Sequence, residues 1–178
     1  MLFLVFQVGA HRYAIDAGQV AEVLPLVAIT AIARAPEEVA GVLVYRGAPV
    51  PVVDLSQLLE GRPAERRLST RLVIVHYPLG KDVGKYVGID VGIDSAKGGT
   101  RLLGLIAEKA TETIRRQDAE FVDSGVANDR APYLGSVAPD PRGMVQRVDI
   151  PRLLSARHQT LFGQLEEQEW PSPTSQTS

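Results

Sequence analysis

Apolar residues in this chain recur in short runs, bounded by turn residues, which is the pattern of β-strands. In the runs L-F-L-V-F-Q-V and R-L-V-I-V-H-Y branched and aromatic side chains predominate, and glycine or proline follows each run directly. The same criteria predict nine strands, over residues 2–8, 12–15, 20–26, 41–45, 50–53, 72–77, 86–89, 102–107 and 144–148.

Helical patterns are few and short. Residues 36–41 are compatible with one helical turn that ends at Gly41. Residues 54–61 predict a second short helix, with Asp54 as its N-cap and Gly61 as its terminator. The chain is therefore expected to be mainly β.

A short repeat relates the two halves of the chain. The frame V-D-aliphatic-x-x-L-L-x-x-R occurs at 53–62 and again at 148–157, and an Arg-Gly pair precedes each copy, at 46–47 and at 142–143. The repeat predicts two similar small β-subdomains. A unit of roughly 70 residues has a thin core on its own, so the two should pack together, with a groove between them as the natural ligand site.

These patterns lead to one expected domain over residues 1–165. Within it we place the first subdomain at about 15–70 and the second at about 71–150 together with the N-terminal strand. A C-terminal helix is expected over 151–165, and the acidic, Pro/Ser-rich stretch 166–178 predicts a disordered tail.

Composition narrows the function classes. Glycine (16) and proline (12) are frequent, which suits many short elements and turns. The net charge is −2, and the basic field of a nucleic-acid-binding protein is missing. Cysteine is absent, so disulfides and thiolate zinc sites are excluded, and no apolar run is long enough to span a membrane. A cytoplasmic protein is the expectation.

Catalytic or metal-binding patterns are not evident. The histidines lack metal-ligand spacing, and the glycine-rich segment 80–99 lacks the P-loop spacing and its hydroxyl residue, so we interpret it as a surface insertion. Asp54 and Asp149 could be paired carboxylates, but each stands where a strand ends and a Leu-Leu helix begins. We therefore expect both to be structural N-caps.

Arg46 is the candidate for binding chemistry. Between Tyr45 and Gly47 it should lie at a hairpin turn, either as a solvated turn residue or as a charged contact for a partner, and the residues alone leave both interpretations open. Pro49 and Pro51 remove two donors from one side of the following strand, which is therefore expected to be an edge strand or irregular at its start.

The sequence resembles a known family, the CheW-like adaptor proteins of chemotaxis. The matching stretches cover about residues 2–157 and include FLVFQVGAHRYAID, VAEVLPL, APEEVAGVLVYRGAPVPVVDL, RLVIVHY and YLGSV followed by GMVQRVDIPRLL. The resemblance implies two small SH3-like, five-stranded β-barrels packed together, with no enzymatic activity and no cofactor.

The resemblance also implies partners. An adaptor of this family bridges the regulatory domain of a CheA-type histidine kinase and the cytoplasmic tip of methyl-accepting chemoreceptors, at membrane-associated receptor arrays. It implies partner binding by Arg46 and Gly47, and it places Val20 and Glu22 on the receptor-binding side. Glu108 departs from the family pattern, because an aspartate is often found in that region.

Two stretches of the chain point to a particular branch of the family. Tyr45 before Arg-Gly and the stretch SGVANDRAPYLG look most like the adaptor of the Wsp surface-sensing branch, whose output is a diguanylate cyclase response regulator. Two alternatives remain: a small-β-barrel nucleic-acid-binding protein, which the acidic composition disfavours, and a hydrolase that uses Asp54 and Asp149.

Overall fold

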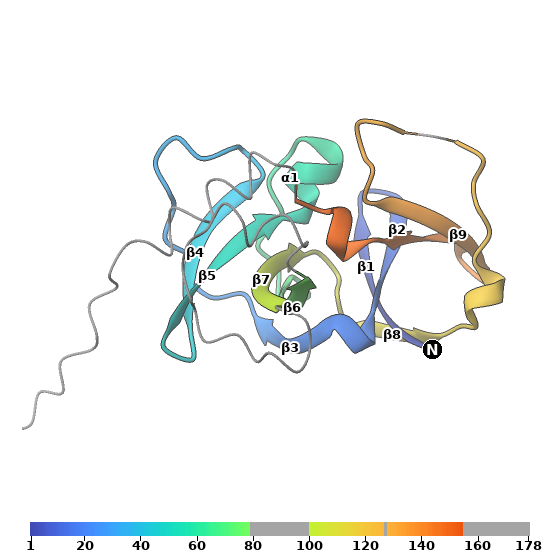
Figure 1. Cartoon of the computed structure of the whole chain (residues 1–178), viewed down its shortest axis with the longest axis horizontal. Helices are drawn as coiled ribbons and strands as arrows, with labels where there is room; N and C mark the ends of the chain where they lie inside the picture. The colour runs from blue at the N-terminus through green and yellow to red at the C-terminus, as the bar shows by residue number, and fades with distance from the viewer. Residues whose placement is uncertain (79–99, 127, 155–178) are drawn as a thin grey trace, which may run out of the picture.

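The computed structural model describes residues 1–78, 100–126 and 128–154, and these form two five-stranded sheets side by side (Figure 1). The first sheet has the order β8 (Glu112–Arg115), β1 (Leu2–Val8), β2 (His11–Asp16), β10 (Gly143–Val148), β9 (Leu134–Asp140). The second has the order β3 (Val20–Pro25), β6 (Arg71–Pro78), β7 (Thr100–Ala107), β5 (Ala48–Asp54), β4 (Val39–Tyr45). The predicted mainly β fold is confirmed.

The two sheets have the same topology. In each, three antiparallel strands are joined through one parallel pair, β2–β10 or β7–β5, to a closing hairpin. The two copies of the repeat occupy matching places, because Asp54 ends β5 and Asp149 directly follows β10. The internal repeat in the sequence therefore corresponds to a repeat of structure.

The strands are divided between the subdomains differently from the prediction. Strands β6 and β7, at 71–107, pair with β3 and β5 and belong to the first subdomain rather than to the second. The first subdomain therefore contains the sheet β3-β6-β7-β5-β4. The second subdomain contains the sheet β8-β1-β2-β10-β9, which is completed by β1 and β2 from the N-terminus. The reason is that residues 15–70 supply only three of the five strands that the sheet needs.

Burial explains why some strands are continuously apolar rather than alternating. Leu72 and Ile74 of β6 face a cluster inside the first subdomain, and Val73 and Val75 face the cluster between the two sheets. A strand covered on both faces needs apolar residues at every position. The cluster between the sheets also contains Phe6, Tyr13 and Ile15 of the first sheet, so it joins the two subdomains.

The first subdomain closes on itself through a short bridge. Thr30, in the loop after β3, pairs with Val42 of β4 through two backbone hydrogen bonds of 3.0 and 2.8 Å. Gly41 makes this approach possible, since a Cβ on it would lie 2.0 Å from the Thr30 carbonyl oxygen, and its φ is 142°. Gly41 is thus part of β4 and does not end a helix; residues 36–39 form only one hydrogen-bonded turn.

Strand β5 is internal rather than an edge strand, and the other expectation for it, an irregular start, is the one that its pairing matches. It pairs with β4 along its length, but with β7 only at Val52–Asp54. Pro49 and Pro51 lie opposite Val44 and Val42, and in a hairpin with a two-residue loop these pairs are not hydrogen-bonded. The missing donors therefore face the β7 side, where pairing begins only after them.

Short helical elements follow the strands. Helix α1 (Leu55–Glu60) and the 3₁₀ turn η5 (Ile150–Arg152) follow Asp54 and Asp149; two further turns are η1 (Ala17–Gln19) and η4 (Asp118–Glu120). Strands β8 and β9 were not predicted. The strand expected at 86–89, the insertion 80–99, the part of the 151–165 helix after 154 and the tail 166–178 lie outside the described residues.

Candidate functional site

The tip of the β4–β5 hairpin is formed by Arg46 and Gly47. Tyr45 and Ala48 are the last paired residues, and both tip residues have positive φ, 50° for Arg46 and 80° for Gly47. This is the two-residue hairpin turn in which Asn-Gly is preferred. An arginine in the left-handed region costs about 1–2 kcal/mol relative to glycine, so the turn itself does not favour it.

The Arg46 side chain lies in a small polar cluster. Its Nη2 is 3.4 Å from Oε2 of Glu22, and its guanidinium carbon is 5.1 Å from the centre of the Tyr45 ring. The Tyr45 hydroxyl donates a hydrogen bond to the same Glu22 oxygen. We call Glu22, Tyr45 and Arg46 the hairpin cluster. Because the Arg46 side chain is 75% exposed, most of its donors face solvent.

Barrel closure brings Glu22 to the hairpin. Glu22 is on β3, at one edge of the second sheet, whereas Arg46 is on the hairpin at the other edge. A bulge between Val20 and Glu22 shifts the register, so that Glu22 pairs with Ile74 and Val20 with Val75. Val20 packs against the core between the sheets instead. The structure thus joins Glu22 to Arg46 and Gly47 but leaves Val20 outside the cluster.

Tyr45 is protonated in this cluster. The hydrogen bond to Glu22 and then burial raise the pKa of Tyr45, and the nearby Arg46 charge opposes this only in part. Tyr45 is therefore a neutral hydrogen-bond donor across the physiological range.

The second Arg-Gly pair differs in geometry. Gly143 already pairs with Asp140, so Arg142 is in the loop and Gly143 is in β10, and Arg142 lacks positive φ. The Arg142 guanidinium binds Glu112, which also accepts from Arg12 at 3.1 Å. The two arginines therefore occupy neither the same turn position nor the same surroundings, although their sequence context is alike.

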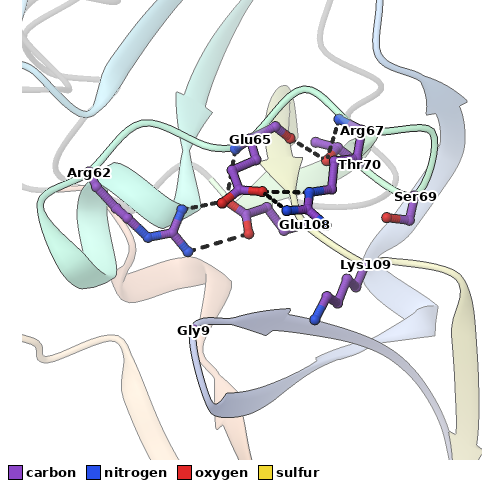
Figure 2. Close-up of a pocket in the computed structure, with 8 residues that line it drawn as sticks. All are labelled: Gly9, Arg62, Glu65, Arg67, Ser69, Thr70, Glu108 and Lys109. Atoms are coloured by element: carbon purple, nitrogen blue, oxygen red, sulfur yellow. Dashed lines mark hydrogen bonds and ion pairs between the residues drawn. The ribbon is translucent and has the colours of Figure 1, made fainter.

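A second polar region surrounds Glu108 at the end of β7, beside a cavity of about 160 Å³ (Figure 2). Its carboxylate is buried and accepts from Arg62 Nη1 at 2.7 Å, the Glu65 amide at 2.9 Å and the Ser56 hydroxyl at 3.0 Å. Burial opposes ionisation, but these donors outweigh it and lower the pKa of Glu108.

Glu108 therefore fixes the loop after α1 to the end of β7. In the sequence, Glu108 stands out only as a departure from the family pattern. The signal that could have found it is a single glutamate directly after the apolar strand L-L-G-L-I-A.

Comparison with known proteins identifies the family. A family model described as the CheW-like domain matches residues 2–158. The chain belongs to the CheW-like domain family. A similar solved structure is the crystal structure of the scaffolding protein TtCheW from Thermoanaerobacter tengcongensis, with a TM-score of 0.68, 22% identity, and coverage of 87% of this chain and 88% of that chain. That similarity shows a shared fold of two SH3-like subdomains. No protein with a curated description matches.

The chemistry proposed for the two aspartates is not assembled in this CheW-like chain. Asp54 is buried, and both of its oxygens are occupied, by the amides of Ser56, Gln57 and Ala64. Asp149 adjoins the other sheet and makes no capping hydrogen bond, which corrects its predicted role; instead it pairs with Arg152 at 3.4 Å. Asp54 is therefore a helix cap, and Asp149 only occupies the equivalent position.

Neither a metal-binding cluster nor a membrane-spanning helix is found among the described residues. Residues 1–78, 100–126 and 128–154 contain no group of three or more metal-ligating side chains. Across these same residues no helix is long and apolar enough to cross a membrane.

Proposed function

We propose that this CheW-like protein is a non-enzymatic signalling adaptor that couples methyl-accepting chemoreceptors to a CheA-type histidine kinase. Family membership and the CheW fold support the proposal. The solved relative is itself described as a scaffolding protein. The site of action would be the cytoplasm, at membrane-associated receptor arrays.

The observation that carries the proposal is the hairpin cluster. Arg46 adopts a strained backbone conformation that glycine would adopt freely, yet its side chain stays 75% exposed. One ion pair and one cation–π contact hold the guanidinium in place, so less rotamer entropy is lost when a partner binds. These are the features of a binding residue, and we assign partner contact to Arg46 and Gly47, with Glu22 as the residue that orients the arginine.

The mechanism would be positional. Contacts of a standard size, about 1,200–2,000 Å² of buried area, are enough to keep receptor and kinase adjacent. The state of the receptor then changes kinase activity only to the extent that the adaptor binds the active and the inactive arrangement of the kinase with different affinities. Val20 packs into the core between the sheets, so we propose that it acts on receptor binding by shaping β3 beside Glu22.

The decisive experiment compares Arg46→Ala with Arg142→Ala. Binding to the kinase regulatory domain and to receptor tips is measured by isothermal titration calorimetry, and stability by thermal unfolding. Arg46→Ala is expected to weaken binding to at least one partner by about 2 kcal/mol, roughly 30-fold, as for an interface hot spot. It removes one exposed ion pair and one exposed cation–π contact, together worth about 1 kcal/mol, so Tm should change by no more than about 4 °C.

Arg142→Ala is the matched control, because it changes the same residue type in the loop of a second hairpin. Equal effects of the two variants on binding would show that turn chemistry and not the hairpin cluster is responsible. Normal binding by Arg46→Ala, or its unfolding, would remove the basis for assigning Arg46 to the interface.

We further propose that the adaptor serves a Wsp-type surface-sensing pathway. The support is the sequence resemblance at Tyr45 before Arg-Gly and at SGVANDRAPYLG. The test is to reconstitute the adaptor with the kinase and response regulator encoded beside it and to measure cyclic-di-GMP. Kinase activation without cyclic-di-GMP synthesis would reject the branch while leaving the adaptor function intact.

A further inference from the structure

Two cavities lie next to each other where the chain passes from β7 of one sheet to β8 of the other. They have volumes of about 160 and 210 Å³, and both are lined by Ser69 and Lys109. Arg62 and Arg67 line the first, and Arg12, Thr111 and Arg142 line the second. Residues from both subdomains therefore contribute to the walls.

Lys109 is at the centre of this region, and its backbone is held rigidly. It is in the connection from β7 to β8, with a φ of 51°, one of three positive values among the non-glycine residues described. Its neighbours attach the connection to both subdomains: the Glu108 carbonyl accepts from the Gln7 amide at 3.0 Å, and the Ala110 amide donates to the Ser69 carbonyl at 3.2 Å. The backbone of this lysine is therefore strained and fixed on both sides, while its side chain is exposed.

Three side-chain donors on these walls have no partner. Over the described residues, the ammonium of Lys109 and the hydroxyls of Ser69 and Thr111 make no hydrogen bond or ion pair, and Figure 2 draws no dashed line to Lys109. The nearby carboxylates do not neutralise Lys109. Glu108 is bound by Arg62, Glu112 is shared by Arg12 and Arg142, and Glu65, which also lines the first cavity, is paired with Arg67.

We propose that these cavities form a binding site for a phosphate group, either the free ion or a phosphate monoester. One ammonium and two hydroxyls are the donors that a tetrahedral oxyanion accepts from, and Arg142, whose side chain is 62% exposed, adds positive charge at the rim. A bound phosphate would contact Ser69 beside the first subdomain and Thr111 before β8 of the second. It would therefore join the two subdomains at their connection.

The test is a phosphate titration of the full chain followed by ¹H–¹⁵N NMR, at constant ionic strength. Saturable shifts are expected at the amides of Ser69, Lys109 and Thr111. Lys109→Gln should weaken the apparent affinity about fivefold, as for loss of an exposed ion pair, whereas Arg66→Gln, which removes an exposed charge outside both cavities, should not. Lys109→Gly removes the ammonium and the backbone strain together, so loss of binding without loss of Tm is expected.

Glycerol 3-phosphate in a parallel titration distinguishes the source of the phosphate group. Binding of the ester with similar affinity assigns the site to phosphate monoesters, and binding of inorganic phosphate alone assigns it to the free ion. Shifts that remain linear, that sodium chloride reproduces, or that are unchanged in Lys109→Gln would overturn the proposal.

Discussion

Replacing Asp54 by alanine tests how differently the two copies of the repeat use the same residue. The Asp54 carboxylate is buried at the start of α1, where Oδ1 accepts from the amides of Ser56 at 2.9 Å and Gln57 at 3.2 Å. Oδ2 accepts from the amide of Ala64 at 2.8 Å, in the loop after the helix. One side chain therefore fixes both the start of α1 and the loop after it.

The expected loss follows from these three bonds. Loss of an N-cap costs about 1 kcal/mol, and a partly buried amide left without an acceptor, here Ala64, costs about 1–3 kcal/mol. Asp54→Ala should therefore lower the free energy of unfolding by about 3 kcal/mol. For a chain of this size that corresponds to a Tm lower by about 9 °C.

Asp149→Ala is the matched control. Asp149 holds the same place after β10, but its carboxylate makes no capping bond, and the ion pair with Arg152 is exposed. Its replacement should change the free energy of unfolding by no more than about 0.5 kcal/mol.

Urea unfolding of the full chain, followed by far-UV circular dichroism, measures both variants at one pH. The midpoint should fall strongly for Asp54→Ala and hardly at all for Asp149→Ala, with the slope unchanged in both. Similar losses in the two variants would refute the reasoning, since they would mean that position in the repeat, rather than the hydrogen bonds made, sets the contribution.

Two further predictions concern Glu108 and the glycines. The pKa of Glu108 is lowered by folding, so its contribution is complete above its ordinary pKa of 4.5 and is lost as the pH falls through the lower folded value. Urea midpoints measured from about pH 6 to pH 3 should therefore fall less in Glu108→Gln than in the wild type, and parallel curves would contradict this. Gly41→Ala should prevent folding, because its Cβ would lie 2.0 Å from the Thr30 carbonyl oxygen. A Cβ on Gly47 meets open space, so Gly47→Ala should cost only about 1 kcal/mol of unfolding free energy, for its positive φ. If circular dichroism showed that the two variants lose the same amount of folded structure, the close approach of Gly41 to Thr30 would not be the cause.

Local pattern was enough to find most strands. The apolar runs of β1 and β6 and the cap and terminator of α1 are properties of neighbouring residues, and the structure confirms them. Strand β9 was missed because Gly135 and Pro139 weaken its pattern. At the edge of a sheet, however, the missing proline donor need not pair, so the strand forms.

Sequence spacing could not assign strands to subdomains. The division at about residue 70 placed β6 with the second half, whereas its pairing with β3 is made across some fifty residues of chain and follows from completing a five-stranded sheet. The sequence likewise left open whether β5 is an edge strand or is irregular at its start. The prolines show which side of β5 lacks hydrogen-bond donors, but only the assembled sheet decides that β7 lies on that side and pairs with β5 beyond the prolines.

The sequence by itself determined the strand pattern, the repeat, the turn at Arg46-Gly47 and the family resemblance, because each is written in residues close together in the chain. Only the tertiary structure decided what surrounds each site. Barrel closure brings Glu22 to Arg46, and packing leaves Glu108 satisfied and Lys109 without a partner among the residues that the structure describes. Long-range pairing decides these environments, since side chains far apart in sequence meet only after the sheets have formed.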